Sequence, residues 1–433
     1  MIKSDPSRSE RQSSQVIVTT APWPDARASD PVALGWMVGS PPPADRIIRF
    51  EDGSFWHFPK WRWSFSHWRE LVPTVNVSRG EAPARHLPRA ERSDLDGVAF
   101  TPIGASQPMT WAQSLEANYT DGIVVLHRGR IVYERYFGAL APEQPHIAFS
   151  VTKSFFGTLA AMLIAEGRLD RQAPVAHYLP ELASSGFGDA TVTQVMDMTT
   201  ALDFTEVYDD PHSAFHDYAR AVGFAPRPAG YSGSASVYEY LATVRKAGEH
   251  GEAFAYRSIN TDVVGWLIAR VTGRPAHEVL GERIWSQLGM EQDAHLQVDS
   301  TGTPLVCAAL NASLRDLARF GELLRLDGVC DGRQIVPAAV VADIRRGGSR
   351  KAFAAAGYQT LPGWSYRSQW WVSHGEHAVF TGRGIHGQAI YVDPKAEMVI
   401  ARFASHPLAS NLNLDPTSLP AYAALATRLV AEP

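Results

Sequence analysis

A β-hairpin pattern stands near each end of the chain, and the long stretch between the two hairpins has helical periodicity. The first hairpin joins residues 123–126 to 131–136, and the second joins 389–392 to 398–403, each through a short turn. Strands at both ends with a helical middle favour one sheet built from both chain ends. We therefore predict an α/β (α+β) fold, in which a central antiparallel sheet from both ends is flanked by helices and carries an inserted, mainly helical lobe at about 170–300.

Three helices between the hairpins are predicted from apolar periodicity and from a glycine just beyond their last turn. They cover residues 155–166, 261–272 and 313–326.

The N-terminal part of the chain divides by composition. Residues 1–30 are polar and aperiodic, which is typical of a mobile tail. Residues 31–92, here called the aromatic arm, are dense in large rings: Trp36, Phe50, Phe55, Trp56, Phe58, Trp61, Trp63, Phe65 and Trp68. We expect this arm to pack on the body, residues 93–433, which form the main domain; a lectin-like aromatic platform is the alternative.

Charge and cysteine content exclude several classes of protein. The chain has 45 acidic and 40 basic residues, a net charge of −5 and no basic block, so no nucleic-acid or anionic membrane partner is expected. Two cysteines, Cys307 and Cys330, cannot build a disulfide framework. No apolar run is long enough to span a bilayer, and no secretory signal follows Met1. We expect a cytoplasmic protein.

Two motifs fail on their context. Residues 382–387 spell GxGxxG, but they run into a strand, whereas the dinucleotide fingerprint must open a helix. His277-Glu278 begins like a zinc protease motif but lacks its second histidine. No metal and no cofactor are predicted.

Ser150-Val151-Thr152-Lys153 places a serine three residues before a lysine where a helix begins. Residues i and i+3 share a helix face, so Ser150 Oγ and Lys153 Nζ come within hydrogen-bond reach. The helix that follows is apolar nearly all round, which indicates burial. Burial lowers the pKa of a lysine, so that a neutral amine can accept the serine proton. The N-terminal end of the helix also stabilises negative charge on a nucleophile.

The rarity of lysine supports this interpretation. Of the 40 basic residues six are lysines, which leaves 34 arginines, and arginine cannot deprotonate. A lysine at position 153 therefore suggests a requirement that arginine cannot meet. The alternative is that Ser150 caps the helix and Lys153 extends to solvent.

Further motifs follow in order: Tyr256-Arg257-Ser258, and then a glycine-rich strand entry at 381–385. This order resembles the penicillin-recognising serine hydrolases of the class C β-lactamase type, and within them the subgroup of 6-aminohexanoate-dimer hydrolases, the nylon-oligomer amidases. The segments similar to that subgroup are 150–154, 256–262, 369–371 and 384–388. The resemblance implies a β-lactamase/transpeptidase-like fold.

The resemblance also implies catalytic roles. Ser150 would be acylated, Lys153 would deprotonate it, and Tyr256 would relay the proton to the leaving amine and activate water. The backbone N–H groups of Ser150 and Ile385 would form the oxyanion hole, although the glycines leave the strand register open by a residue or two. For Tyr256, the alternative is a buried core residue.

The residues expected to contact substrate are Tyr208, Ser258, Trp371, Gly384 and His386. Tyr208 matches a loop residue that caps the substrate, and Trp371 matches an aromatic wall of the cleft, although each ring could simply pack. The expected partner is a small amide or ester, and a homodimer is allowed.

Two departures from the β-lactamase pattern bear on the substrate. Gly382-Arg383-Gly384 stands where β-lactamases carry Lys-Thr-Gly, and Ser258 stands where they carry asparagine. Both favour a serine hydrolase that cleaves short linear amides or carboxylic esters. The alternatives are a carboxylesterase, lactonase or weak β-lactamase of the same fold and, from another class, a non-catalytic ligand-binding sensor.

Overall fold

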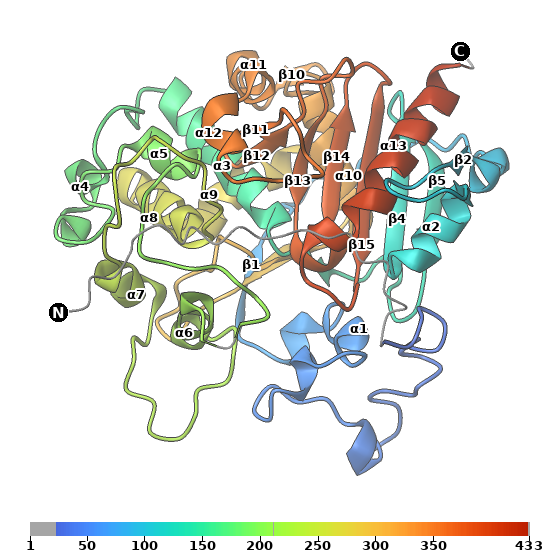
Figure 1. Ribbon diagram of the computed structural model, residues 1–433, viewed down its shortest axis with the longest axis horizontal. Coiled ribbons are helices and arrows are strands. Elements are labelled where there is room, and N and C mark those ends of the chain that lie inside the picture. Colours follow the sequence, from blue (N-terminus) through green and yellow to red (C-terminus); the bar gives the residue numbers. More distant parts are fainter. Residues whose placement is uncertain (1–22, 211, 432–433) are drawn as a thin grey trace.

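A computed structural model describes residues 23–210 and 212–431. Its largest sheet has seven antiparallel strands in the order β11-β12-β13-β14-β15-β4-β5 (Figure 1). These strands are β4 (Thr120–His127), β5 (Arg130–Tyr136), β11 (Ser365–Arg367), β12 (Trp370–Val372), β13 (Phe380–Arg383), β14 (Ala389–Asp393) and β15 (Met398–Ala404). The N-terminal and the C-terminal hairpin meet where β15 pairs with β4, with Ile400 opposite Val125. The sheet predicted from both hairpins is confirmed.

The predicted helices are present as α3, α8 and α10, and α3 begins four residues earlier than predicted. The described helices are α1 (Trp61–Ser64), α2 (Trp111–Ala117), α3 (Val151–Ala165), α4 (Val175–Tyr178), α5 (Val192–Met196), α6 (Ala214–Val222), α7 (Val237–Thr243), α8 (Ile259–Thr272), α9 (Ala276–Arg283), α10 (Leu314–Arg325), α11 (Ala338–Arg346), α12 (Arg350–Ala354) and α13 (Asp415–Val430). Gly273, just beyond α8, adopts a left-handed conformation with φ +69°, as a helix-ending glycine should.

Helices cover both faces of the large sheet. Because successive strand residues point to opposite faces, Val125 packs on the side of α2 and α13, and Leu126 packs on the side of α3 and α10. Figure 1 shows α4 to α9 gathered beside the sheet, on the left of the view. These six helices form the helical lobe of the described chain.

A smaller four-stranded sheet, in the order β1-β7-β8-β6, was not predicted. Its strands are β1 (Thr74–Val77), β6 (His146–Ile147), β7 (Ala294–Gln297) and β8 (Leu310–Ala312). The remaining described strands form two separate pairs, β2 (Ala99–Phe100) with β3 (Met109–Thr110) and β9 (Val329–Cys330) with β10 (Arg333–Gln334). Strands of two to four residues are too short to show an alternating pattern in the sequence. The strand β6 matters most here because it leads directly into Ser150.

The helix α3 is central, as its apolar sequence indicated. Every residue from Val151 to Leu163 is buried. The helix passes so close to the turn before β12 that a Cβ on Gly157 would lie 2.3 Å from the carbonyl oxygen of Ser368, so glycine is required there for space. The N-terminal end of α3 is thereby fixed against the sheet.

The rings of the aromatic arm are mostly buried. Phe55, Trp61, Trp63, Phe65 and Trp68 form one cluster with Ile147 and Phe149 of the body. These rings therefore pack inside the molecule and present no platform to solvent.

Of the predicted tail, residues 1–30, the first 22 residues lie outside the described part of the chain. Its last part is packed. The guanidinium of Arg62 donates to the carbonyl oxygen of Ala26 at 2.5 Å and to the hydroxyl of Ser29 at 2.9 Å, and Ser29 is buried. Residues 23–30 therefore belong structurally with the aromatic arm, because Arg62 holds them.

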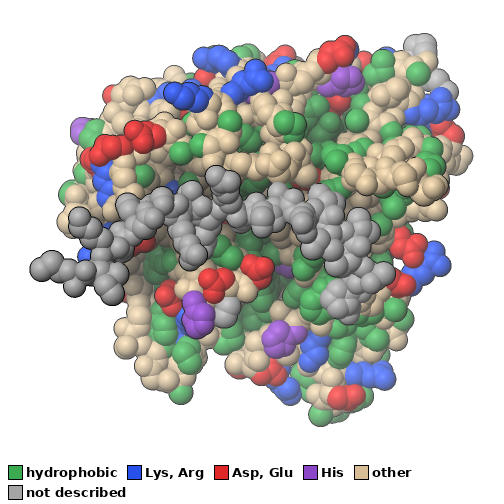
Figure 2. All heavy atoms as spheres, in the orientation of Figure 1, with side chains coloured by type: hydrophobic (Ala, Val, Ile, Leu, Met, Phe, Trp, Pro, Cys, Tyr) green, Lys and Arg blue, Asp and Glu red, His purple; other side chains and the backbone are tan. Residues whose placement is uncertain are grey.

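The described helices bear on the expectation about a membrane span, and one face of the molecule shows how its charges are distributed. Within residues 23–210 and 212–431, no helix is both long enough and apolar enough to cross a membrane. Figure 2 shows Lys and Arg side chains scattered over the face drawn, interleaved with Asp and Glu.

Candidate active site

Ser150 stands at the N-terminal end of α3. Its side chain makes no capping hydrogen bond to the helix, and the residue is 7% exposed. The residue before it, Phe149, has a left-handed backbone with φ +42°, which is strained for a side chain of this size. The helix-cap alternative for Ser150 is therefore excluded.

Lys153 is buried and points at Ser150. Its Nζ lies 2.9 Å from Ser150 Oγ, 3.0 Å from Ser258 Oγ and 2.6 Å from the carbonyl oxygen of Cys307. The side chain of Lys153 is 1% exposed, which excludes the alternative that it extends to solvent. Ser258, which was predicted to contact substrate, contacts the lysine, and its contact with substrate stays a prediction.

Glu206 fixes the proton of Ser258. The Ser258 hydroxyl donates to Glu206 Oε1 at 2.6 Å, the Ser258 N–H donates to Glu206 Oε2, and the Tyr208 hydroxyl donates to Glu206 Oε1 at 2.6 Å. Since the single proton of Ser258 goes to Glu206, its oxygen must accept from Lys153, as the Cys307 carbonyl must. A neutral Lys153 therefore uses both N–H groups on these two acceptors, and its lone pair faces the Ser150 hydroxyl.

The pKa of Lys153 differs in direction from the expectation. Burial lowers it, but the anionic forms of Tyr256 and Cys307 and the Glu206 carboxylate outweigh burial, so the pKa of Lys153 is raised above that of a free lysine. The prediction of a lowered pKa was wrong because it counted burial without these neighbours. Burial also raises the pKa of Tyr256. Lys153 and Tyr256 thus titrate as a coupled pair.

Tyr256 lies over Lys153 and against an aromatic wall. Its ring centroid is 5.2 Å from Lys153 Nζ, and its ring stacks on that of Trp371 at 5.5 Å. Trp371 belongs to a buried cluster that includes Phe254 and Tyr366. The structure thus brings Tyr256 and Trp371 to Lys153, and Tyr208 joins them through Glu206.

Two backbone N–H groups beside the nucleophile are unpaired within the described parts of the chain. Neither the N–H of Ser150 nor that of Ile385 donates to a described residue. Gly384 brings the second group close, because a Cβ on Gly384 would lie 3.1 Å from the Ser150 nitrogen and 2.7 Å from the carbonyl oxygen of Ala148. Two unpaired N–H groups at one helix end suit an oxyanion hole.

His386 does not reach the site. It is 3% exposed, its Nδ1 lies 2.7 Å from the carbonyl oxygen of His406, and its ring packs on Trp61 and Phe65 at 4.9 and 5.2 Å. Burial lowers the pKa of His386 to about 4, so the ring is neutral at physiological pH. The prediction that His386 contacts substrate is corrected: its ring points into the aromatic arm.

The one cation on strand β13 is already neutralised. Arg383 forms an ion pair with Asp415, and its guanidinium lies 5.3 Å from the ring centroid of Trp371. The side chains of Arg383 and Asp415 are 9% and 5% exposed. Arg383 therefore supports the aromatic wall and offers little charge to a ligand.

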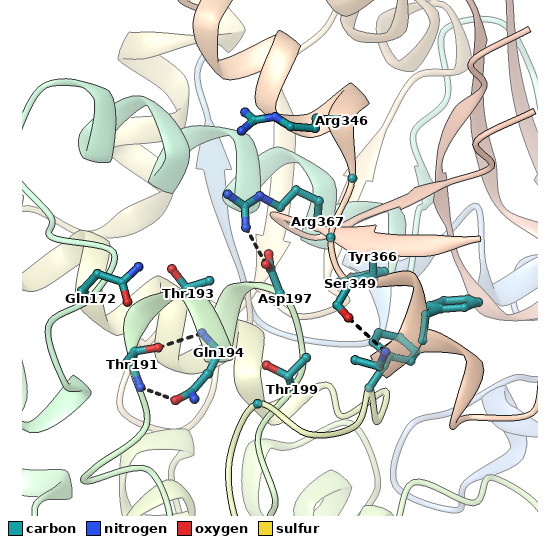
Figure 3. Close-up of a pocket in the computed structure, with 16 residues that line it drawn as sticks. Gln172, Thr191, Thr193, Gln194, Asp197, Thr199, Arg346, Ser349, Tyr366 and Arg367 are labelled. Atoms are coloured by element: carbon teal, nitrogen blue, oxygen red, sulfur yellow. Dashed lines mark hydrogen bonds and ion pairs between the residues drawn. The ribbon is translucent and has the colours of Figure 1, made fainter. Parts of the chain in front are cut away.

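A polar cavity of about 500 Å³ adjoins that wall, and Figure 3 draws the residues that line it. Phe254 and Tyr366, which pack on Trp371, are among its lining residues, whereas none of the predicted catalytic residues is. Figure 3 shows Arg367 donating to Asp197, at 2.8 Å, and Arg367 also pairs with Asp343. These ion pairs are satisfied internally and brace the strand that precedes the wall.

Sequence reasoning missed two groups of the site. Glu206 stands two residues before Tyr208, and a carboxylate so close to a predicted contact residue was a usable signal. The backbone carbonyl of Cys307 carries no signal, because any residue supplies the same atom.

The chain is similar to known hydrolases over most of its length. Residues 112–417 match the profile of the Beta-lactamase family. The chain is 37% identical over 352 residues to a 6-aminohexanoate-dimer hydrolase from Paenarthrobacter ureafaciens, covering 81% of this chain and 86% of that relative. The solved structure of a candidate 6-aminohexanoate-dimer hydrolase from Bacillus anthracis matches with a TM-score of 0.82 and 31% identity. The match covers 90% of this chain and 100% of that chain. A family VIII carboxylesterase shares the fold, with a TM-score of 0.53 and 17% identity over 74% of this chain and 95% of that chain.

Proposed function

The chain belongs to the β-lactamase family of serine hydrolases, and on that premise we propose that it is an amidase that cleaves short linear amides of the 6-aminohexanoate-dimer type. The observation that carries this proposal is the contact of buried Lys153 with Ser150 at 2.9 Å. The two other contacts of Lys153 are acceptors, so deprotonated Lys153 can direct its lone pair only at Ser150.

In the first half-reaction, Ser150 Oγ attacks the amide carbonyl carbon while its proton passes to Lys153. The carbonyl oxygen becomes an oxyanion, which the N–H groups of Ser150 and Ile385 stabilise. The C–N bond then breaks, and Tyr256 gives the leaving amine its proton and is reprotonated by Lys153. The product is an ester between the acyl group and Ser150.

In the second half-reaction, water attacks the acyl-enzyme. Tyr256 and Lys153 together take the proton of the water, and the Ser150 oxygen leaves and recovers a proton from the same pair. The pair therefore ends each cycle in the protonation state in which it began.

The charges around the nucleophile favour this substrate class over β-lactams. A β-lactam carries a carboxylate close to its scissile bond, and a cation beside the strand normally receives it. Here Arg383 is paired with Asp415, and the Glu206 carboxylate stands behind Tyr208 and Ser258. A substrate carboxylate next to the scissile carbonyl would find no unpaired cation on β13.

A substrate panel tests this proposal. With p-nitrophenyl butyrate we expect a burst of p-nitrophenolate equal to the enzyme concentration, because an activated ester acylates Ser150 faster than water removes the acyl group, so the acyl-enzyme accumulates. With 6-aminohexanoate dimer we expect sustained turnover. With a cephalosporin we expect turnover to be slower by about 100-fold or by a larger factor, because the charged partner of its carboxylate is missing. Sustained hydrolysis of esters alone would support a carboxylesterase, and a burst without any turnover would support the ligand-binding sensor.

The dependence of kcat/KM on pH should reveal the coupled pair. Because the pKa of Lys153 is raised, little of the amine is neutral at pH 7, and kcat/KM on the amide should rise into the alkaline range. The Tyr256→Phe variant lacks the neighbour that most raises the pKa of Lys153, so its rise should occur at lower pH and reach a lower maximum. A flat profile from about pH 6 to 10, or a rise that Tyr256→Phe leaves in place, would contradict the pairing.

The Gly384→Ala variant tests the oxyanion hole. The added Cβ would approach the Ala148 carbonyl oxygen to 2.7 Å and the Ser150 nitrogen to 3.1 Å, so the segment that follows β13 must move away from Ser150. We expect kcat for the ester to fall about 100-fold, as for the loss of one oxyanion donor. Gly97→Ala is the matched control, because nothing lies within 4 Å of its added Cβ. Equal rates in the two variants would refute this assignment.

We further propose a cytoplasmic location and a small-molecule partner. Cys307 and Cys330 are both unpaired and buried, which suits a reducing compartment. Fractionation of the host cell with detection of the protein would test the location.

A further inference from the structure

Two residues with a left-handed backbone flank the two oxyanion donors. Phe149, with φ +42°, directly precedes Ser150, and His386, with φ +61°, directly follows Ile385. Residues other than glycine avoid this conformation, so the surrounding structure must hold both in place. The N–H group of Ser150 belongs to the peptide unit that directly follows Phe149, and the N–H group of Ile385 lies one residue before His386. A relaxation of either strained residue would therefore displace the donor beside it.

One aromatic cluster holds both strained residues. The ring of Phe65 lies 4.9 Å from that of Phe149 and 5.2 Å from that of His386. Trp56 contacts the same two rings, at 5.7 and 5.9 Å, and Phe149 and His386 lie 5.7 Å apart. Phe65 and Trp56 both come from the aromatic arm.

The arm is tied to the body at the same place. The carbonyl oxygen of Phe65 accepts the N–H of Ile147 at 2.8 Å, three residues before Ser150. The indole of Trp61 donates to the carbonyl oxygen of Ser405 at 3.2 Å, and the guanidinium of Arg62 donates to the Ser405 hydroxyl at 3.1 Å. Ser405 directly precedes His406, whose carbonyl oxygen receives the Nδ1–H of His386.

We propose that the aromatic arm is a positioning element of the oxyanion hole, in which Phe65 and Trp56 hold Phe149 and His386 so that the N–H groups of Ser150 and Ile385 converge on one point. This inference rests on the proposed function and gives the arm a role in it. In this proposal the rings act through Phe149 and His386 on the two backbone donors, and not on the substrate.

The test compares two variants of the arm. Phe65→Leu keeps an apolar side chain but removes the ring that contacts both strained residues. Trp63→Leu is the matched control: Trp63 lies in α1, two residues before Phe65, and belongs to the same buried cluster, but its described ring contact is a stack on His67 at 3.9 Å. Both variants should lose thermal stability, whereas only Phe65→Leu should lose catalysis.

The expected result is a fall in kcat of about 10- to 100-fold for Phe65→Leu on p-nitrophenyl butyrate with KM little changed, as expected for a displacement of about 1 Å at the reacting centre. A second readout reports on the hole itself. In the thiono analogue of p-nitrophenyl butyrate, sulfur replaces the carbonyl oxygen. This sulfur would lie in the oxyanion hole, where it accepts weaker hydrogen bonds than oxygen. The ratio of rates for the ester and its thiono analogue should fall in Phe65→Leu and stay at the wild-type value in Trp63→Leu.

If Phe65→Leu does not fold, His386→Asn makes the same test, because asparagine tolerates the left-handed backbone but lacks the ring. A wild-type ester-to-thiono ratio in the folded variant would overturn the proposal. A wild-type enzyme that turns over neither p-nitrophenyl butyrate nor 6-aminohexanoate dimer would overturn the proposed function instead, so the two failures are distinguishable.

Discussion

Replacing Ser150 with alanine should lower turnover of both amide and ester by about 10⁴-fold or more, as for the loss of other serine nucleophiles. The structure adds an expectation about stability. Loss of a helix-capping serine costs about 1 kcal/mol, but the Ser150 side chain makes no capping hydrogen bond. The free energy of unfolding should therefore stay close to that of the wild type while activity disappears.

A chemical denaturation curve beside the rate measurement separates the two roles of Ser150. Thr110 offers a matched control, because its side chain does cap a helix, α2, in a capping box with Gln113. Thr110→Ala should lose stability and keep activity. The opposite pattern in Ser150→Ala, stability lost and activity kept, would return Ser150 to a structural role.

Replacing Lys153 with arginine should be nearly as damaging as replacing it with alanine. Arginine keeps the charge, but its guanidinium does not deprotonate and cannot accept the Ser150 proton. The site is also shaped for one nitrogen with three partners, Ser150, Ser258 and the Cys307 carbonyl. We expect kcat to fall about 10²- to 10⁴-fold in both variants, the usual contribution of a general base.

The measurement is kcat on p-nitrophenyl butyrate for the wild type, Lys153→Arg and Lys153→Ala. A surface lysine provides the control, since Lys395 pairs with Glu376 at the protein surface and Lys395→Arg should keep full activity. An active Lys153→Arg enzyme would show that charge at this position suffices and would remove Lys153 as the base.

The fold was predictable where patterns are long. The hairpins β4–β5 and β14–β15 consist of mostly apolar strands of five to eight residues joined by short turns, which is enough to be recognised. The helix α3 could be recognised as buried because it is apolar nearly all round. The four-stranded sheet could not be predicted, since its strands are two to four residues long. Its pairing is decided by the packing of distant segments.

The site was predictable as far as the motifs carried chemistry. Ser150 and Lys153 meet because a serine three residues before a lysine shares its helix face. Tyr256, expected from the order of the motifs, lies over Lys153. His386 was misplaced because letters next to a motif do not reveal the direction of a side chain, and its left-handed backbone turns the ring into the aromatic arm. The raised pKa of Lys153 was missed because it depends on Glu206 and Tyr256, which only the fold brings near.

The direct test of covalent catalysis is the mass of the enzyme after brief reaction with p-nitrophenyl butyrate and acid quenching. The tryptic peptide 136–153 contains one serine, Ser150. We predict one butyryl group on this peptide in the wild type and none in Ser150→Ala. An unmodified peptide during rapid turnover, or a butyryl group on Ser150→Ala at another residue with turnover intact, would contradict an acyl-enzyme on Ser150.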